Sequence, residues 1–309
     1  MTQNSRAFRA LRLAAAAMLM TTAQGHAVEF GATITPFGVM DFGAGMLPPP
    51  TPHGTWGLRL AYYSSDRLQD SRGDTIANGF DISVKTYGLA YLRMTDHEIW
   101  GARYGFSAVI PVMDLNARMT VPTPAGPLGL QGSELGLGDV QIVPVMLQWA
   151  APPNLFVNAM LQIQAPTGDF DAKAPFNIGT NHWTISPMVG LTWISDGGFE
   201  VSTQTMVNFN TENKDTHYTS GIEWKQEFAV GQHVGDWTVG MAGYVYQQLT
   251  DDDGPGVIDG NRARGYALGP AVSFLRPGMP MLSLHAYKEF GARNRPEGVN
   301  VALRSSISF

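Results

Sequence analysis

Apolar residues alternate with small or polar residues along much of this 309-residue chain. Between His182 and Ile194 the apolar set begins at Trp183 and ends at Trp193, and threonine, serine, methionine and glycine fill the positions between. The last stretch, Gly298 to Phe309, repeats the alternation and ends on an aromatic residue. Because successive side chains of a strand point to opposite faces, this period of two predicts strands with one apolar face.

About twelve such segments follow one another, and each is close to the ~9–11 residues that a tilted strand needs to cross a membrane. The connections between them run long, short, long, short, as in outer-membrane barrels with long external loops and short periplasmic turns. We therefore predict an all-β fold, an antiparallel transmembrane β-barrel of about twelve strands over residues 55–309, rather than a soluble sandwich. The predicted strands are Thr55 to Arg67, Phe80 to Met94, Ala102 to Leu115, Asp139 to Ala150, Leu155 to Ala165, His182 to Ile194, Phe199 to Asn210, Tyr218 to Val230, Trp237 to Thr250, Arg264 to Leu275, Met281 to Phe290 and Gly298 to Phe309.

The N-terminus has the order of a secretory signal peptide. Three arginines, Arg6, Arg9 and Arg12, precede a short apolar run, and small residues lead to Ala27. The run is far shorter than the ~20 residues of a spanning helix, so we predict a signal peptide over residues 1–27, cleaved after Ala27 or after Ala23. An exported barrel belongs in the bacterial outer membrane, with lipid as its surroundings.

Composition narrows the function classes. The chain has no cysteine, which suits export through an oxidising periplasm, and its 35 glycines and 20 prolines favour turn-rich β structure. Without the three signal-peptide arginines, 17 basic residues stand against 26 acidic ones, a net charge of −9. This charge argues against a nucleic-acid partner.

Several short motifs follow one another along the chain: Leu47-Pro48-Pro49-Pro50, Gly136-Leu137-Gly138-Asp139, Leu147-Gln148-Trp149, Ala165-Pro166-Thr167-Gly168-Asp169-Phe170, Asn181-His182-Trp183, Phe209-Asn210-Thr211-Glu212-Asn213, Thr216-His217-Tyr218-Thr219-Ser220-Gly221 and Gly243-Tyr244-Val245-Tyr246-Gln247-Gln248. In their order and spacing they resemble a family of outer-membrane proteins assigned to the meta-cleavage pathway of phenol degradation. The resemblance covers Leu47 to Phe309 and implies passage of aromatic or other poorly soluble compounds across the outer membrane. The terminal strand, ending on Phe309, resembles the closing strand of outer-membrane barrels, which implies recognition by the barrel assembly machinery.

The segment Val28 to Gly54 precedes the first strand and carries Phe30, Phe37, Met40 and Phe42 among glycines and prolines. Exposing so many apolar side chains to water is unfavourable, so the segment needs a cover. It either folds into the barrel as a plug, creating an apolar path for a ligand, or packs beneath the barrel as a periplasmic cap. The sequence leaves both open.

Alternation along the strands also predicts which side chains face the lumen. These candidates combine charged groups with tyrosines, so they either pair with one another to hold the wall together, which is the commoner role, or select a ligand. They are Arg59, Tyr63, Arg103, Glu223, Lys225, Glu227, Tyr244, Tyr246, Gln248, His285, Tyr287, Glu289 and Arg304.

Signals for catalysis and metal binding are weak. The chain lacks a Gly-x-Ser-x-Gly elbow and a His-Glu-x-x-His motif, although His182 with Ser186, or His217 with Ser220, leaves a surface lipase conceivable. The acidic run beginning at Asp251 lacks the ligand order of an EF-hand. We therefore expect no enzyme, metal or cofactor.

The sequence thus predicts an outer-membrane channel that passes small hydrophobic or aromatic compounds into the periplasm. Two alternatives remain. A general diffusion porin would have a lumen dominated by charge and no apolar plug, whereas a ligand-binding or adhesion barrel would have a sealed lumen and recognition in its external loops.

Overall fold

The computed structural model describes residues 36–150 and 152–309, which form thirteen β-strands. None of the described residues lies in a helix long and apolar enough to cross a membrane. The strands are β1 (Thr55–Ser65), β2 (Asp81–Ile99), β3 (Ala102–Val121), β4 (Leu128–Leu137), β5 (Gln141–Ala150), β6 (Leu155–Gln164), β7 (Thr184–Ile194), β8 (Phe199–Asn210), β9 (Glu223–Val234), β10 (Trp237–Gln248), β11 (Arg264–Phe274), β12 (Met281–Arg293) and β13 (Val299–Ser308).

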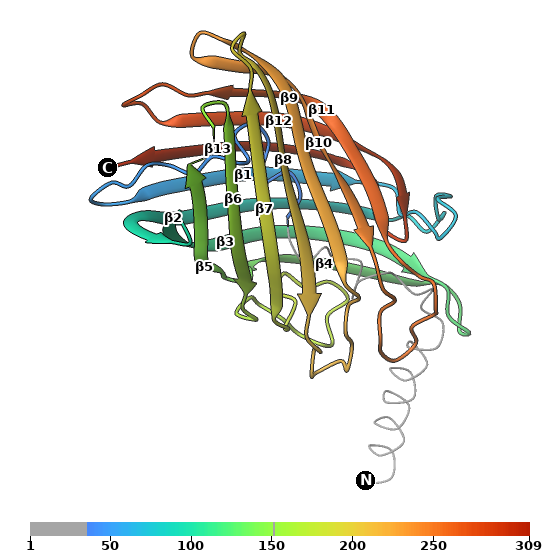
Figure 1. Cartoon of the computed structure of the whole chain (residues 1–309). Coiled ribbons are helices and arrows are strands. Elements are labelled where there is room, and N and C mark those ends of the chain that lie inside the picture. The colour runs from blue at the N-terminus through green and yellow to red at the C-terminus, as the bar shows by residue number, and fades with distance from the viewer. Residues whose placement is uncertain (1–35, 151) are drawn as a thin grey trace.

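Twelve of these strands close into an antiparallel barrel, which confirms the predicted fold class (Figure 1). The last strand returns to the first, and β13 pairs with β1 from Thr55 opposite Ser308 to Ser64 opposite Val299. The first strand therefore begins, and the last strand ends, at the same rim of the barrel, as the even strand number requires. The long connections lie at the opposite rim, which is the external one.

The alternation of faces also agrees with the sequence. On β7, Ile185, Val189 and Leu191 are exposed on the outer face, whereas Thr184 and Ser186 are fully buried. The outer wall is thus apolar and the inner wall polar, the reverse of a soluble protein with an apolar core. This inversion is typical of a barrel in the bacterial outer membrane.

The strand boundaries predicted from the sequence leave a long external connection over residues 116–138, and this prediction is wrong. The third strand continues to Val121, and most of the remaining segment forms β4, paired from Val112 opposite Leu137 to Val121 opposite Leu128. The sequence of β4, LGLQGSELGL, is rich in glycine and has low strand propensity. Its backbone hydrogen bonds to the open edge of β3 override that propensity.

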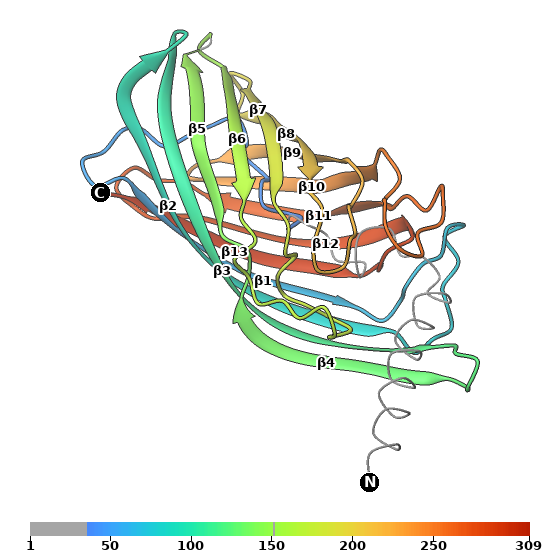
Figure 2. The same ribbon diagram turned by 90° about the horizontal axis from the view of Figure 1, so that it is seen from below.

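The barrel wall divides at the connection between β4 and β5, where the two strands separate along the same edge of β3. One edge of β3 pairs with β5 as far as Val109 and then with β4 from Val112, so Pro111 lies at the change of partner. Figure 2 shows β4 following β3 away from β5 and β6. The connection after β6 is fastened at this division, because the Asp139 carboxylate accepts hydrogen bonds from the backbone N–H of Gly168 at 2.8 Å and of Thr180 at 2.9 Å.

Candidate functional site

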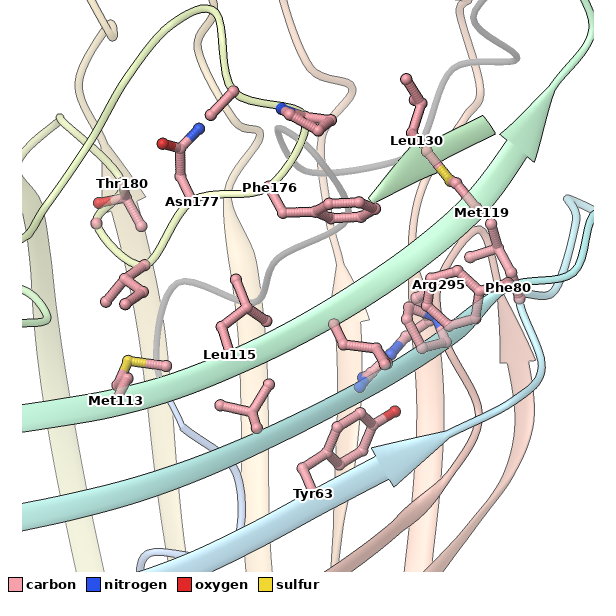
Figure 3. Close-up of a pocket in the computed structure, with 18 of the residues that line it drawn as sticks. Tyr63, Phe80, Met113, Leu115, Met119, Leu130, Phe176, Asn177, Thr180 and Arg295 are labelled. Atoms are coloured by element: carbon pink, nitrogen blue, oxygen red, sulfur yellow. The ribbon is translucent and has the colours of Figure 1, made fainter. Parts of the chain in front are cut away.

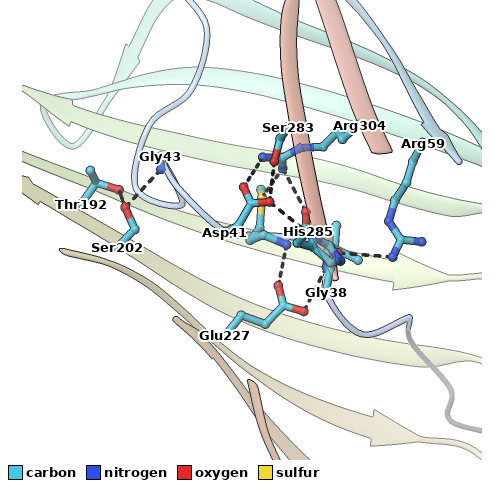
Figure 4. A network of polar contacts seen from close by, with 12 residues as sticks. Gly38, Asp41, Gly43, Arg59, Thr192, Ser202, Glu227, Ser283, His285 and Arg304 are labelled. Carbon is cyan, nitrogen blue, oxygen red and sulfur yellow. Dashed lines mark hydrogen bonds and ion pairs between the residues drawn. The ribbon is translucent and has the colours of Figure 1, made fainter. Parts of the chain in front are cut away.

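Residues 36–47, here called the lumen segment, lie inside the barrel against inward-facing side chains of the wall (Figure 4). In the first half of the segment, the Glu227 carboxylate accepts hydrogen bonds from the N–H of Val39 at 3.2 Å and of Met40 at 2.6 Å. The guanidinium of Arg59 donates to the carbonyls of Phe37 at 3.0 Å and of Gly38 at 3.2 Å. Strand side chains thus satisfy backbone groups that an irregular segment cannot pair with itself.

The second half of the segment is bound in the same way. The N–H of Gly43 donates to Glu200 at 2.7 Å, and that of Leu47 donates to Gln148 at 2.8 Å. Gly45 lies so close to the wall that a Cβ atom there would stand 2.4 Å from the Thr192 backbone nitrogen. Only glycine allows this approach of the two backbones.

An ion pair joins the middle of the segment to the last strands. Arg304 binds Asp41 with 3.0 Å between Nη2 and Oδ1, and Ser283 Oγ donates to the other carboxylate oxygen at 2.5 Å. His285 Nδ1 lies 3.4 Å from the same oxygen, and Asp41 is 2% exposed. Hydrogen bonds that involve a charged group are the stronger ones, so this cluster fixes the segment to β12 and β13.

The aromatic ring of Phe37 packs into a group of aromatic and cationic side chains. Its ring is stacked on Tyr244, with centroids 4.6 Å apart and planes 13° apart, and meets Tyr246 edge-on at 5.1 Å. The Arg295 guanidinium lies 4.6 Å from the Phe37 centroid and 5.1 Å from that of Tyr246. We call Tyr244, Tyr246 and Arg295 the aromatic cage.

Buried carboxylates hold the cage. Glu289 accepts hydrogen bonds from Tyr63 at 2.8 Å, from Tyr244 at 2.5 Å and from Arg295 at 2.9 Å. Burial by itself would lower the pKa of Arg295, but the neighbouring Glu289 carboxylate raises it above its usual value. Arg295 therefore remains charged, and the pair is internally neutralised.

A cavity of about 1080 Å³ opens on the external side of the lumen segment, and Pro36 and Phe37 lie at its base. Its walls come mainly from the inner faces of β1, β2 and β3 and from the connections after β1, β6, β8, β10 and β12. The lining is mainly apolar, including Phe80, Leu115 and Phe176, and Figure 3 shows Arg295 among these side chains. Small ligand sites commonly combine such an apolar wall with a few polar groups.

Most of the lumen residues proposed from the sequence lie on the inner wall, and several meet. Tyr63, Tyr244 and Glu289 form one network, and His285 stacks on Tyr287 with ring centroids 4.0 Å apart. The other buried members are Glu223, bonded to Tyr246 at 2.6 Å, Gln248, and Lys225, whose ammonium lies 3.6 Å from Glu227.

Other candidates are placed differently. Arg103 is exposed near the turn between β2 and β3, where its backbone lies opposite Gln148 of β5. It therefore lies apart from the cavity. Phe30 lies outside the described residues. Met40 Sδ is 3.0 Å from Arg304, and the ring of Phe42 packs on Gly231, where a Cβ atom would stand 2.5 Å from the ring.

Sequence reasoning did not identify Asp41 or Arg295. Arg295 lies in the short connection between β12 and β13, where there is no alternation to indicate which way a side chain points. Asp41 pairs with a residue 263 positions away. The only sequence signal for Asp41 was its place among the aromatic residues of Val28 to Gly54.

Three of the four residues considered for catalysis, His182, Ser186 and His217, have structural partners. His182 Nδ1 lies 3.3 Å from the carbonyl of Trp183, and Ser186 donates to Asn208 at 2.8 Å. His217 contacts Glu212 at 2.9 Å. Asp251 in the acidic run binds Arg262 at 2.8 Å, and within residues 36–150 and 152–309 no cluster of three potential His, Asp or Glu metal ligands occurs.

Comparison with solved structures supports the fold. The chain is similar to an outer-membrane channel from Pseudomonas putida F1, with a TM-score of 0.72, 14% identity, and coverage of 87% of this chain and 100% of that chain. It is also similar to the transport unit of the autotransporter AIDA-I from Escherichia coli, with a TM-score of 0.50, 12% identity, and coverage of 96% and 97%. At these identities the likeness concerns the fold.

No curated protein sequence matches the chain. A family match, in contrast, extends over residues 65–305, from the end of β1 to β13, and so includes nearly the whole barrel. On this match the chain belongs to the family described as "Putative MetA-pathway of phenol degradation".

Proposed function

We propose that this protein is an outer-membrane channel that admits small hydrophobic or aromatic compounds to the periplasm, with residues 28–54 acting as its plug. The apolar cavity on the external side of Phe37 carries this proposal. Its volume of about 1080 Å³ exceeds what one benzene-sized molecule needs, and its lining offers apolar contacts to such a molecule. Membership of a phenol-degradation family and the fold of an outer-membrane channel support the same function.

The lumen segment makes a general diffusion porin the weaker alternative. Hydrated ions and sugars need a continuous water-filled path, whereas here a bonded segment crosses the lumen between Glu227 and Gln148. A sealed ligand-binding barrel has one observation in its favour, because the wall holds this segment at many points. In our proposal the segment moves when a ligand enters.

Two further parts of the proposal concern partners and catalysis. Phe309 is exposed at the periplasmic rim, and we propose that the barrel assembly machinery recognises it there. We propose no catalytic activity, and the solved structures described above are transport proteins.

Uptake by intact cells tests the channel function. A Gram-negative host expressing the protein should take up radiolabelled toluene faster than the same host with an empty vector. Ala61→Trp should reduce this uptake, because Ala61 lines the cavity and an indole would fill it. Leu60→Trp is the matched control, since Leu60 lies next in sequence but is exposed on the outer face.

Uptake no faster than with the empty vector, or equal uptake by the Ala61 and Leu60 variants, would contradict the proposed path. Conductance in planar bilayers separates the alternatives. The intact protein should conduct ions weakly, and a large steady conductance would indicate a general porin instead.

A further inference from the structure

The aromatic cage is built by the barrel and its connections, whereas the ring inside it comes from the lumen segment. Tyr244 and Tyr246 belong to β10, and Arg295 lies between β12 and β13. Phe37 reaches them from a part of the chain more than 200 residues earlier. The cage and its occupant are thus separate pieces of structure, and movement of the segment would leave the cage in place.

Hydrogen bonds fix the two tyrosine rings independently of Phe37. The hydroxyl of Tyr244 donates to Glu289 at 2.5 Å, and that of Tyr246 donates to Glu223 at 2.6 Å. These carboxylates occupy the hydroxyl groups, so the ring faces are what the tyrosines offer to an occupant. A flat aromatic ring is the chemical group that such faces and a guanidinium bind best.

The cavity reaches this position from the external side. Phe37 and Arg295 both line it, so a molecule in the cavity can contact the occupant of the cage and one of its walls. A ligand that arrives from outside can therefore contact Phe37 and Arg295 directly.

On the basis of the proposed channel function, we propose that Tyr244, Tyr246 and Arg295 form a binding site for the ring of a monocyclic aromatic ligand, and that Phe37 occupies this site until such a ligand displaces it. Phe37 is then an intramolecular competitor. The apparent affinity for a ligand equals the affinity of the empty cage multiplied by the fraction of molecules in which Phe37 has left the cage.

Arg295 adds a preference for rings that carry oxygen. It uses one nitrogen to bind Glu289, but its Nε and Nη1 are buried and make no hydrogen bond within the described part of the chain. Buried N–H groups without an acceptor are unfavourable, and the ring of Phe37 offers them no acceptor atom. A phenol brings both a ring and an oxygen, so phenols should bind better than rings without oxygen.

Calorimetry on detergent-solubilised protein, referenced to protein-free micelles, tests this site with phenol as the probe. Phe37→Ala vacates the cage and should tighten phenol binding by about tenfold. Phe42→Ala also removes an aromatic ring from the lumen segment but leaves the cage filled, and it should change the affinity less than about twofold. Adding Tyr246→Leu to the Phe37 variant should cancel the gain.

Cyclohexanol distinguishes ring recognition from apolar filling, because it has nearly the size and hydroxyl group of phenol without the aromatic face. It should bind the Phe37 variant at least about fivefold more weakly than phenol does. Equal binding of the two probes, or an equal gain in the Phe42 variant, would overturn the proposal. So would phenol binding to Phe37→Ala that is no tighter than to the unchanged protein.

A measurement on the unchanged protein keeps the test independent of variant folding. Saturating phenol should speed hydrogen exchange at the amides of Val39 and Met40, which Glu227 binds next to Phe37, whereas cyclohexanol should not. An unchanged exchange rate with bound phenol would overturn displacement. The two proposals also fail separately. Toluene uptake without this phenol binding would reject the cage alone, and phenol binding without uptake would reject the channel.

Discussion

The Glu227 carboxylate offers a direct way to loosen the lumen segment while keeping the backbone pairing of the barrel wall. Its neutralisation also removes the ionic partner of Lys225, whose ammonium lies 3.6 Å away on the same strand. The two Glu227 oxygens accept the N–H groups of Val39 and Met40, and Glu227 is 1% exposed. Glu227→Gln keeps the shape of the side chain but has only one acceptor oxygen, so one N–H faces an amide NH₂ group. The ladder bonds of β9 use the backbone, so they remain unchanged.

The magnitude follows from the bonds that change. A hydrogen bond to a charged group contributes ~1.5–3 kcal/mol and a neutral one ~0.5–1.5 kcal/mol, so replacing two of the first kind by one of the second costs about 2.5–4.5 kcal/mol. Since ~1.4 kcal/mol corresponds to a factor of ten, the population with an undocked segment should rise about 60-fold to about 1,500-fold.

Hydrogen exchange measured by mass spectrometry over residues 36–47 would report this population, and ion conductance would report the opened lumen. Both should increase in the Glu227 variant. Glu212→Gln is the control, because Glu212 is an exposed carboxylate that pairs with His217 in an external connection and touches no part of the segment. Unchanged exchange at Val39 and Met40 in the Glu227 variant would refute the view that this carboxylate holds the segment.

Two further predictions concern the wall and the external rim. Val189→Arg should lower barrel stability by ~2–4 kcal/mol in lipid refolding titrations, whereas Val234→Arg near the periplasmic rim should cost only ~0–1 kcal/mol, and equal costs would show that depth in the membrane is misassigned. Burial lowers the pKa of His182 from its usual 6.5, so its contribution to stability is fully present above pH 6.5 and is lost as the pH falls through the lowered value. Melting temperatures between pH 8 and pH 5 should therefore fall less in His182→Gln, and parallel curves for the two proteins would contradict this.

The sequence predicted the barrel well because each spanning strand carries its own local signal. The alternation from Trp183 to Trp193 assigns both faces of β7 without knowledge of its neighbours. The segment that became β4 had no such signal, since glycine at every third or fourth position replaces the apolar side chains that would mark a face. Only the open edge of β3 makes it a strand, and a single sequence does not show which edges are open.

The same distinction applies to the candidate site: its residues on strands could be predicted from the sequence, and those in irregular segments could not. Tyr244, Tyr246 and Glu289 could be placed on the inner wall because they follow the period of two on β10 and β12. Arg295 and Asp41 lie in irregular segments, where side-chain direction depends on tertiary contacts. Whether Val28 to Gly54 is a plug stays a prediction that the contacts of residues 36–47 support.

The bonds of the lumen segment also constrain the order in which the protein can assemble. Leu47 binds a residue 101 positions later, Met40 one 187 positions later and Asp41 one 263 positions later, on the strand that closes the barrel. Contacts between such distant residues form slowly, since long stretches of chain must first be brought together. The part of the described chain that is synthesised first therefore cannot complete its contacts until β13 has supplied Arg304.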